Sequence, residues 1–76
     1  MNKQRRKNIN ALWEKLEELR ADIEIILDEE QEAYDNMPEA FQDGERGETA
    51  KEAIDNLESA INDIESALYY LDEAAV

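Results

Sequence analysis

Apolar residues recur through the first half of the chain at alternating intervals of three and four positions. The series is interrupted once, by an acid, and its members are Ile9, Leu12, Leu16, Leu19, Ile23, Ile26, Glu30, Ala33 and Met37. This spacing is that of positions a and d in a coiled-coil heptad. No alternation of period two competes with it. The pattern therefore predicts one long amphipathic helix over about residues 3–36.

A second series of the same kind follows without a slip. Its members are Gly47, Ala50, Ile54, Leu57, Ile61, Ile64, Leu68, Leu71 and Ala75. It predicts a second helix over about residues 48–74. Two matched ridges predict an antiparallel pair in which Ile23 faces Ile61 and Leu12 faces Leu71, with Arg20 lying across from Glu65. The expected fold class is all-α: a single domain over residues 1–76 that forms a two-helix coiled-coil hairpin.

The hinge between the helices, about residues 37–47, holds the only proline and both glycines. Pro38 disfavours helical backbone in the residue before it, and it suits the first position of a short turn, "PEAFQ". Gly44 is a candidate for left-handed backbone. Asp43, or the capping box "TAKE" that begins at Thr49, is expected to cap the second helix. Phe41 and Met37 are expected to fold inward and close the hairpin end.

A further stripe of apolar residues flanks each ridge. Heptad position g of the second helix carries Ala53, Ala60, Ala67 and Ala74, and position e of the first carries Trp13, Leu27 and Tyr34. A two-helix hairpin has a single interface and does not cover both stripes. Two alternatives stay open. Either the hairpin has a wide, partly exposed face with the longer side chains lying over the alanines, or these residues mediate self-association of two hairpins into a four-helix bundle.

The composition removes several kinds of chemistry. The 76 residues include neither cysteine nor histidine, so thiolate ligands, imidazole ligands and the usual general base are missing. No apolar run approaches the ~18 residues of a membrane span. The start "MNKQRRKN" lacks the apolar segment of a secretory signal. We expect a non-enzymatic cytoplasmic protein that needs no cofactor and no metal.

Charge is strongly negative and unevenly distributed. The formal net charge is −13; residues 1–16 contain five basic residues and one acid, whereas residues 17–76 contain three basic residues and 20 acids. Such a charge favours cationic partners and makes direct nucleic-acid binding unexpected. The basic cluster Lys3–Lys7 has two interpretations. Acids at the end of the second helix neutralise it within the hairpin, or it contacts phosphate.

Carboxylates are the one abundant functional group. On a helix, carboxylates three or four positions apart lie ~5–6 Å from one another, which is similar to the phosphate spacing along a DNA strand. Two such sets are candidates for partner binding: Glu17, Asp28, Glu32 and Asp35 on the first helix, and Glu48, Glu52, Asp55 and Asp63 on the second. A hinge tip of Glu39, Asp43, Glu45 and Arg46 is a further candidate. The simpler interpretation is that these acids only keep the helices solvated.

One segment carries a resemblance to a known group. The stretch "DEEQEAYDNMPEAFQDGERGE" followed by "AKEAIDNLESAINDIESA", about residues 27–68, resembles small, acidic, uncharacterised proteins encoded in phages, prophages and integrative elements of Gram-positive bacteria. Its most specific part is the hinge "YDNMPE…ERGE". The group supplies no catalytic residues. The resemblance implies genomic company in which small proteins inhibit or adapt host machinery.

These observations lead to two hypotheses of different kinds. In the first, the chain binds a basic groove on a host protein and inhibits it by DNA mimicry, with a CRISPR nuclease, a restriction enzyme, a nucleoid protein or another defence factor as the target. In the second, it is a dimeric assembly module whose apolar stripes bind while the acids solubilise.

Overall fold

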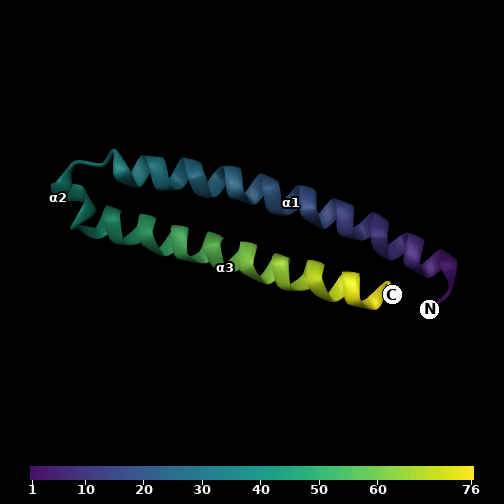
Figure 1. Ribbon diagram of the computed structural model, residues 1–76. Coiled ribbons are helices and arrows are strands. Elements are labelled where there is room, and N and C mark those ends of the chain that lie inside the picture. Colours follow the sequence, from purple (N-terminus) through teal and green to yellow (C-terminus); the bar gives the residue numbers. More distant parts are fainter.

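The computed structural model describes residues 1–76 and contains three helices (Figure 1). Helix α1 spans Lys3–Asp35, α2 is the single turn Glu39–Gln42, and α3 spans Glu45–Ala74. The molecule has no strand and measures 58 × 15 × 11 Å along its principal axes. The prediction of an all-α fold is therefore confirmed.

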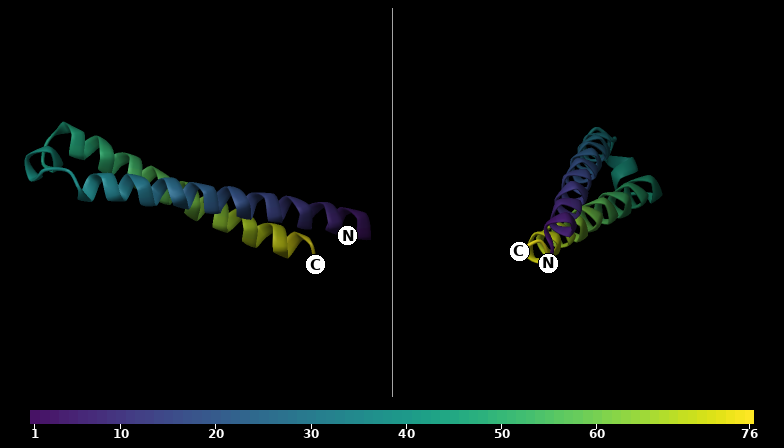
Figure 2. Two further views of the ribbon diagram at one scale, coloured as in Figure 1. Left: turned by 90° about the horizontal axis from the view of Figure 1, so that it is seen from above. Right: turned by 90° about the vertical axis from the view of Figure 1, so that its right-hand side faces the viewer.

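The two long helices lie side by side and run in opposite directions (Figures 1 and 2). They cross at a shallow angle, and both chain ends lie at the end of the hairpin opposite α2. Helix α1 reaches past the end of α3 there, so its first residues have no neighbouring helix. The basic cluster of the sequence, Lys3–Lys7, falls within this overhanging part of α1.

Local signals at each end determine the length of α1. The side chain of Asn2 accepts a hydrogen bond from the backbone N–H of Arg5 at 2.8 Å, which is an N-cap that sequence analysis did not single out. At the other end, Asn36 is the last residue with helical backbone angles, and Met37 lies outside the helix. Pro38 follows Met37, and a proline disfavours helical backbone in the residue before it, so Met37 does not continue the helix.

The hinge is held by Gln42. Its side-chain amide donates a hydrogen bond to the backbone carbonyl of Tyr34 at 2.9 Å, in addition to the bond that this carbonyl accepts from the backbone N–H of Met37 at 3.1 Å, and so ties α2 to the end of α1. The backbone of Gln42 also packs directly against Gly47, where an added Cβ would lie 2.6 Å from the Gln42 Cα. Gly47 therefore serves the close approach of α2 to α3.

Several details of the predicted hinge are wrong. Gly44 has φ −100° and ψ −167°, so it is extended rather than left-handed. It is itself the N-cap of α3, which begins at Glu45, so the capping box at Thr49 lies inside the helix. Asp43 ends α2 and caps nothing in α3. Phe41 remains 47% exposed instead of closing the hairpin end.

The core is a single row on α3 covered by half-buried side chains of α1. Ala50, Ile54, Ile61 and Leu68 are the buried apolar residues, and α1 contributes no fully buried residue. Apart from Glu17, the half-buried positions of α1 are a and e, not a and d. Leu12, Leu19 and Ile26, which the a/d interpretation placed inside, are 54%, 55% and 52% exposed, so that part of the predicted seam is wrong.

The sizes of the side chains account for this rotation of α1. Its e positions are occupied by Trp13, Arg20, Leu27 and Tyr34, all of them half-buried. An aromatic side chain buries more surface than a leucine, and the aliphatic stem of an arginine packs while its guanidinium stays in water. Turning the e row toward α3 therefore removes more apolar area from water than burying the d row would.

Candidate functional site

The predicted acidic sets lie on two separate outer surfaces. Asp28, Glu32 and Asp35 are exposed and follow one another at intervals of four and three residues on the side of α1 that faces away from α3. The acids of α3 lie on its own far side: Glu48, Glu52, Asp55 and Asp63, all exposed. We call these two groups the α1 acidic row and the α3 acidic row. They do not combine into one face.

Glu17 stands apart from the α1 acidic row because it belongs to an ion-pair network. Its carboxylate lies 2.6 Å from the guanidinium of Arg20, which also contacts Glu24 at 2.8 Å. Hydrogen bonding to Arg20 lowers the pKa of Glu17, and the two carboxylates together raise the pKa of Arg20. The predicted juxtaposition of Arg20 and Glu65 does not form an ion pair, since Arg20 is satisfied within its own helix.

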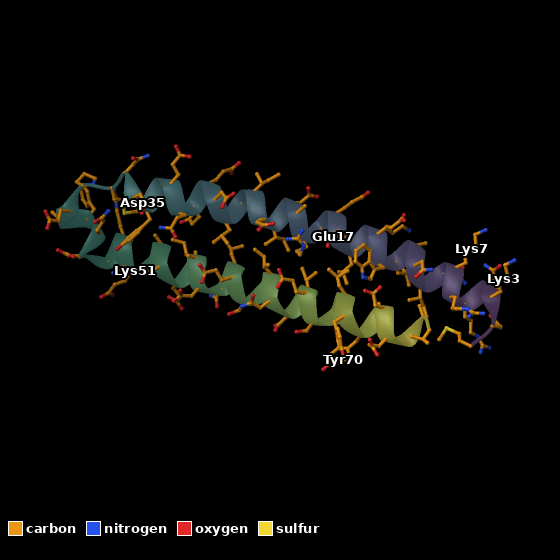
Figure 3. All side chains as sticks on the ribbon, in the orientation of Figure 1. Lys3, Lys7, Glu17, Asp35, Lys51 and Tyr70 are labelled. Carbon is orange, nitrogen blue, oxygen red and sulfur yellow. The ribbon has the colours of Figure 1, made fainter.

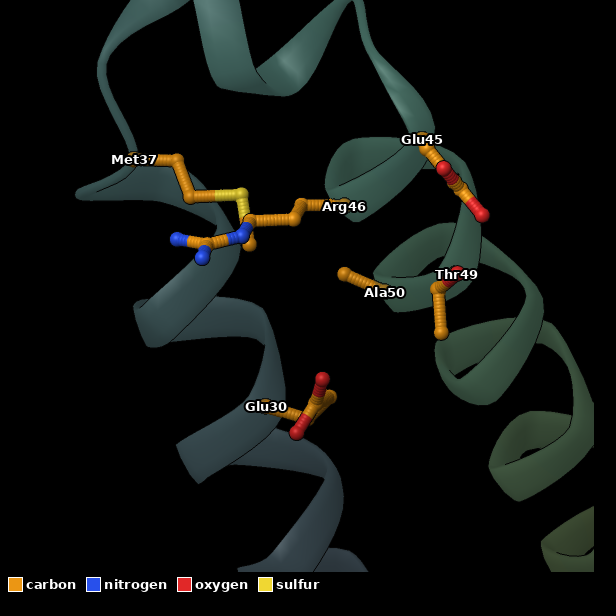
Figure 4. Close-up of a pocket in the computed structure, with 6 residues that line it drawn as sticks. All are labelled: Glu30, Met37, Glu45, Arg46, Thr49 and Ala50. Carbon is orange, nitrogen blue, oxygen red and sulfur yellow. The ribbon is translucent and has the colours of Figure 1, made fainter.

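The hinge tip is exposed and contains an open hollow of ≈ 380 Å³. Figure 4 shows the six residues that line it: Glu30, Met37, Glu45, Arg46, Thr49 and Ala50. Glu30, the one acid on the apolar ridge, is half-buried here and forms no ion pair. The guanidinium of Arg46 instead lies 5.2 Å from the centre of the Phe41 ring and covers it partly. Glu39 and Asp43, the other two members of the predicted hinge tip, do not line this hollow.

The basic cluster at the overhanging end of α1 has no acidic partner. Figure 3 shows Lys3 and Lys7 at this end, and the ion pairs of the structure involve Arg20 alone. Neutralisation by the acids of α3 was one of the two interpretations of this cluster, and the overhang of α1 keeps those ion pairs from forming. Asp72 instead shares a hollow with Trp13 farther along α1, and Glu73 is exposed.

The predicted self-association residues are divided between the two sides of the hairpin. The ammonium of Lys51, at position e of α3, lies 5.5 Å from the centre of the ring of Tyr34, at position e of α1. The e rows therefore share one side, where Trp13 and Leu27 are half-buried as well. On each helix the g and d rows flank the a row on the opposite side from e. The alanines of α3, Ala53, Ala60 and Ala67, consequently lie on the other side.

Two exposed features were missed by sequence reasoning. The first is the d row of α1, which was assigned to the core. The second is an aromatic pair on the outer surface of α3: the rings of Tyr69 and Tyr70 lie 5.5 Å apart, edge to face, and the residues are 60% and 68% exposed. Two consecutive aromatic residues at positions b and c are a signal that could have indicated it.

Comparisons with known proteins add no relative. No protein-family model matches the chain, and no curated protein or solved structure matches it either. None of the helices has an apolar segment of the length and hydropathy needed to cross a bilayer. The carboxylates, although numerous, are spread along the helices and do not form a cluster of three that would suit a metal ion.

Proposed function

We propose that the chain is a non-enzymatic interaction protein of phage or mobile-element origin that binds a cationic surface of a host protein in the bacterial cytoplasm and inhibits it. The support is the set of exposed carboxylates that no cation of the chain occupies. The ion pairs use only Glu17 and Glu24, so the α1 acidic row and the α3 acidic row are available to a partner.

The spacing of the acidic rows favours a partner that normally binds nucleic acid. Residues at i, i+4 and i+7 on a helix form a straight row of charges with ~5–6 Å between neighbours. A groove lined by lysine and arginine that follows a phosphate backbone would meet a similar series of charges on either outer surface of the hairpin. Because the two rows lie on separate surfaces, we expect one row to bind at a time. Nucleases of CRISPR and restriction systems and nucleoid proteins are targets with such grooves.

Row-specific charge reversal tests this proposal. A partner is captured from a Gram-positive host lysate, identified by mass spectrometry and purified. Its affinity is then measured for the wild type and for two triple variants. The α1 variant combines Asp28→Lys, Glu32→Lys and Asp35→Lys, and the α3 variant combines Glu48→Lys, Glu52→Lys and Asp55→Lys. We expect one triple variant to lose binding. Duplex DNA should compete with the wild type, and raising the salt concentration should weaken the complex.

A matched control separates the row from the net charge. The variant Glu58→Lys, Glu65→Lys, Asp72→Lys changes the charge equally, at exposed positions of the e row. It should retain most of the affinity. Binding that ignores salt, or a control that fails as completely as the row variants, would contradict the proposal.

A second candidate function is favoured by one observation, the exposure of the α1 d row. In this alternative the chain is a homodimeric assembly module, its acids serve solubility, and reversing the acidic rows leaves its binding unchanged. Association of two hairpins into a four-helix bundle would cover apolar surface that the single hairpin leaves in water.

A further inference from the structure

The longest exposed apolar feature of the molecule is a ridge on α1. Leu12, Leu19 and Ile26 are each more than half exposed, and each lies two helical turns from the next. Isolated exposed leucines are ordinary on protein surfaces, but three in line at heptad spacing form a row of the kind that packs against another helix.

The ridge continues onto α3 across the same side of the hairpin. The contact of Lys51 with Tyr34 places both e rows on one side, so both d rows lie on the other. There α3 contributes Leu57, Ile64 and Leu71, which are only half-buried, and the alanines Ala53, Ala60 and Ala67 follow d positions by three residues. We call this side, the d rows of both helices with the alanines of α3, the open face.

The total surface indicates how much of the molecule a partner would cover. The accessible surface is 5797 Å² for a chain of 8.8 kDa. A compact monomer of this mass exposes about 4,800 Å², so the hairpin exposes about 1,000 Å² more. A stable interface of standard size covers about 800 Å² on each partner. No large side chain is fully buried in the single hairpin, which leaves the core to be completed from outside.

We propose that a second copy of the chain occupies the open face and forms a two-fold symmetric four-helix bundle. This inference deepens the second candidate function and rests on it. Two symmetric arrangements stack one open face on another. An axis across the hairpin sets α1 antiparallel on α1 of the partner copy, whereas an axis along the hairpin sets α1 on α3 and brings hinge onto hinge.

Charge complementarity selects the axis across the hairpin. The overhanging tip carries Lys3, Arg5, Arg6 and Lys7 without an acidic partner, and the opposite end of the molecule carries Asp35, Glu39 and Asp43, all exposed. Stacking hinge on hinge would bring the acidic hinges of the two copies together. The antiparallel arrangement instead places the basic tip of each copy beside the acidic hinge of the other.

The spacing of the ridge fits this axis. If the axis passes near Asp22, Leu19 of one copy meets Ile26 of the other, and Leu12 meets Ala33. In each copy, every one of the four d positions of α1 then makes one contact with a d position of the other copy. An isologous interface requires this kind of self-complementarity.

Sedimentation equilibrium tests the occupant and the face. Wild type should be a dimer, and Leu19→Asp should raise the dissociation constant by about tenfold or more, because a charge replaces a contact in both copies. Ile25→Asp is the matched control: Ile25 is 58% exposed at position c, away from the open face, and its substitution should leave the dimer intact. Circular dichroism verifies that both variants remain helical.

Single cysteines test the axis, since the chain has none of its own. Asp22→Cys should be cross-linked to its counterpart by a short bis-maleimide, and Ala40→Cys, in the hinge, should not. The reverse result would select the hinge-on-hinge arrangement and overturn the charge argument. Arg5→Glu with Arg6→Glu should weaken the dimer, and adding Glu39→Lys with Asp43→Lys should restore it.

The possible results distinguish a failure of the assembly function from a failure of the proposed interface. A wild type that stays monomeric at all accessible concentrations overturns the assembly function and this geometry together. A dimer that survives Leu19→Asp but dissociates with Leu27→Asp, on the side of the e rows, overturns the open face as the interface while the assembly function stands. A dimer insensitive to the paired charge reversals overturns the contact of tip and hinge.

Discussion

The ammonium of Lys51 lies 5.5 Å from the centre of the ring of Tyr34, across the interface between α3 and α1. Interaction with the Tyr34 side chain is the largest cause that raises the pKa of Lys51, and the negative charges of Asp43 and Glu48 act in the same direction. This contact fixes which sides of the two helices lie together near the hinge. It thereby determines that the d rows form the open face.

The raised pKa of Lys51 predicts a loss of stability at alkaline pH. A cation whose pKa is higher in the folded state stabilises that state fully below the ordinary lysine pKa of about 10.4, and the contribution is lost as the pH rises through the folded value. Tyr34→Phe keeps the ring but removes the hydroxyl, so the pKa of Lys51 should fall toward its ordinary value. Titration of the Lys51 side chain by NMR measures this, and an unchanged pKa in the Phe variant would count against the assignment.

Shortening two isoleucines, one in the core and one on the surface, should change the free energy of unfolding by different amounts. Ile61 is 7% exposed in the row that α1 covers, whereas Ile25 is 58% exposed. Ile61→Val should lower the free energy of unfolding by about 0.5–1.5 kcal/mol, and Ile25→Val should change it by less than about 0.5 kcal/mol. Urea denaturation followed by circular dichroism compares them. Equal effects would mean that α1 and α3 do not pack as described.

The heptad pattern was enough to predict the helices but not the rotation of α1. The stripe of Ile and Leu identified the two long elements and their antiparallel pairing around Pro38, because helical periodicity and proline sterics are local. Which stripe of α1 faces inward depends instead on the partner helix. Trp13 and Tyr34 outweigh the leucines of the d row once α3 lies beside them, with Asp72 near Trp13 and Lys51 against the ring of Tyr34.

In the hinge and the candidate sites, too, local features could be predicted from the sequence, and features that depend on contacts between helices could not. Gly47 is needed because of a contact with Gln42 five residues away in a different helix, and nothing in the local sequence distinguishes it from a flexible glycine. The exposure of the acidic rows could be predicted from their heptad positions. Their separation onto two outer surfaces could not, because it follows from the rotation of both helices about their axes.

Replacing Gly47 by alanine should destabilise the hairpin, although helix propensity alone predicts the opposite. Alanine is favoured over glycine inside a helix by about 1 kcal/mol. At Gly47, however, the new Cβ would overlap the backbone of Gln42, so we expect Gly47→Ala to destabilise the hairpin by about 1–3 kcal/mol. Gly44→Ala is the control, since its Cβ would lie 3.4 Å from the Ala40 carbonyl oxygen, and it should cost less than about 1 kcal/mol. Thermal unfolding of both variants checks the order.

Two substitutions of Trp13 should separate the stabilisation gained by burying its ring from the cost of burying its N–H group. The indole Nε1 is buried without a hydrogen-bond partner, although Asp72 lines the same hollow. A buried donor without a partner costs about 1–3 kcal/mol.

Trp13→Phe should therefore leave the stability unchanged or raise it, because most of the ring contact remains and the orphaned donor is removed. Trp13→Ala should lower the stability by about 3 kcal/mol, which is most of what so small a core supplies. Chemical denaturation followed by circular dichroism measures both, since either variant removes the only tryptophan. A large loss in the Phe variant would show that Nε1 has an acceptor after all, and Asp72→Asn would then be expected to reproduce that loss.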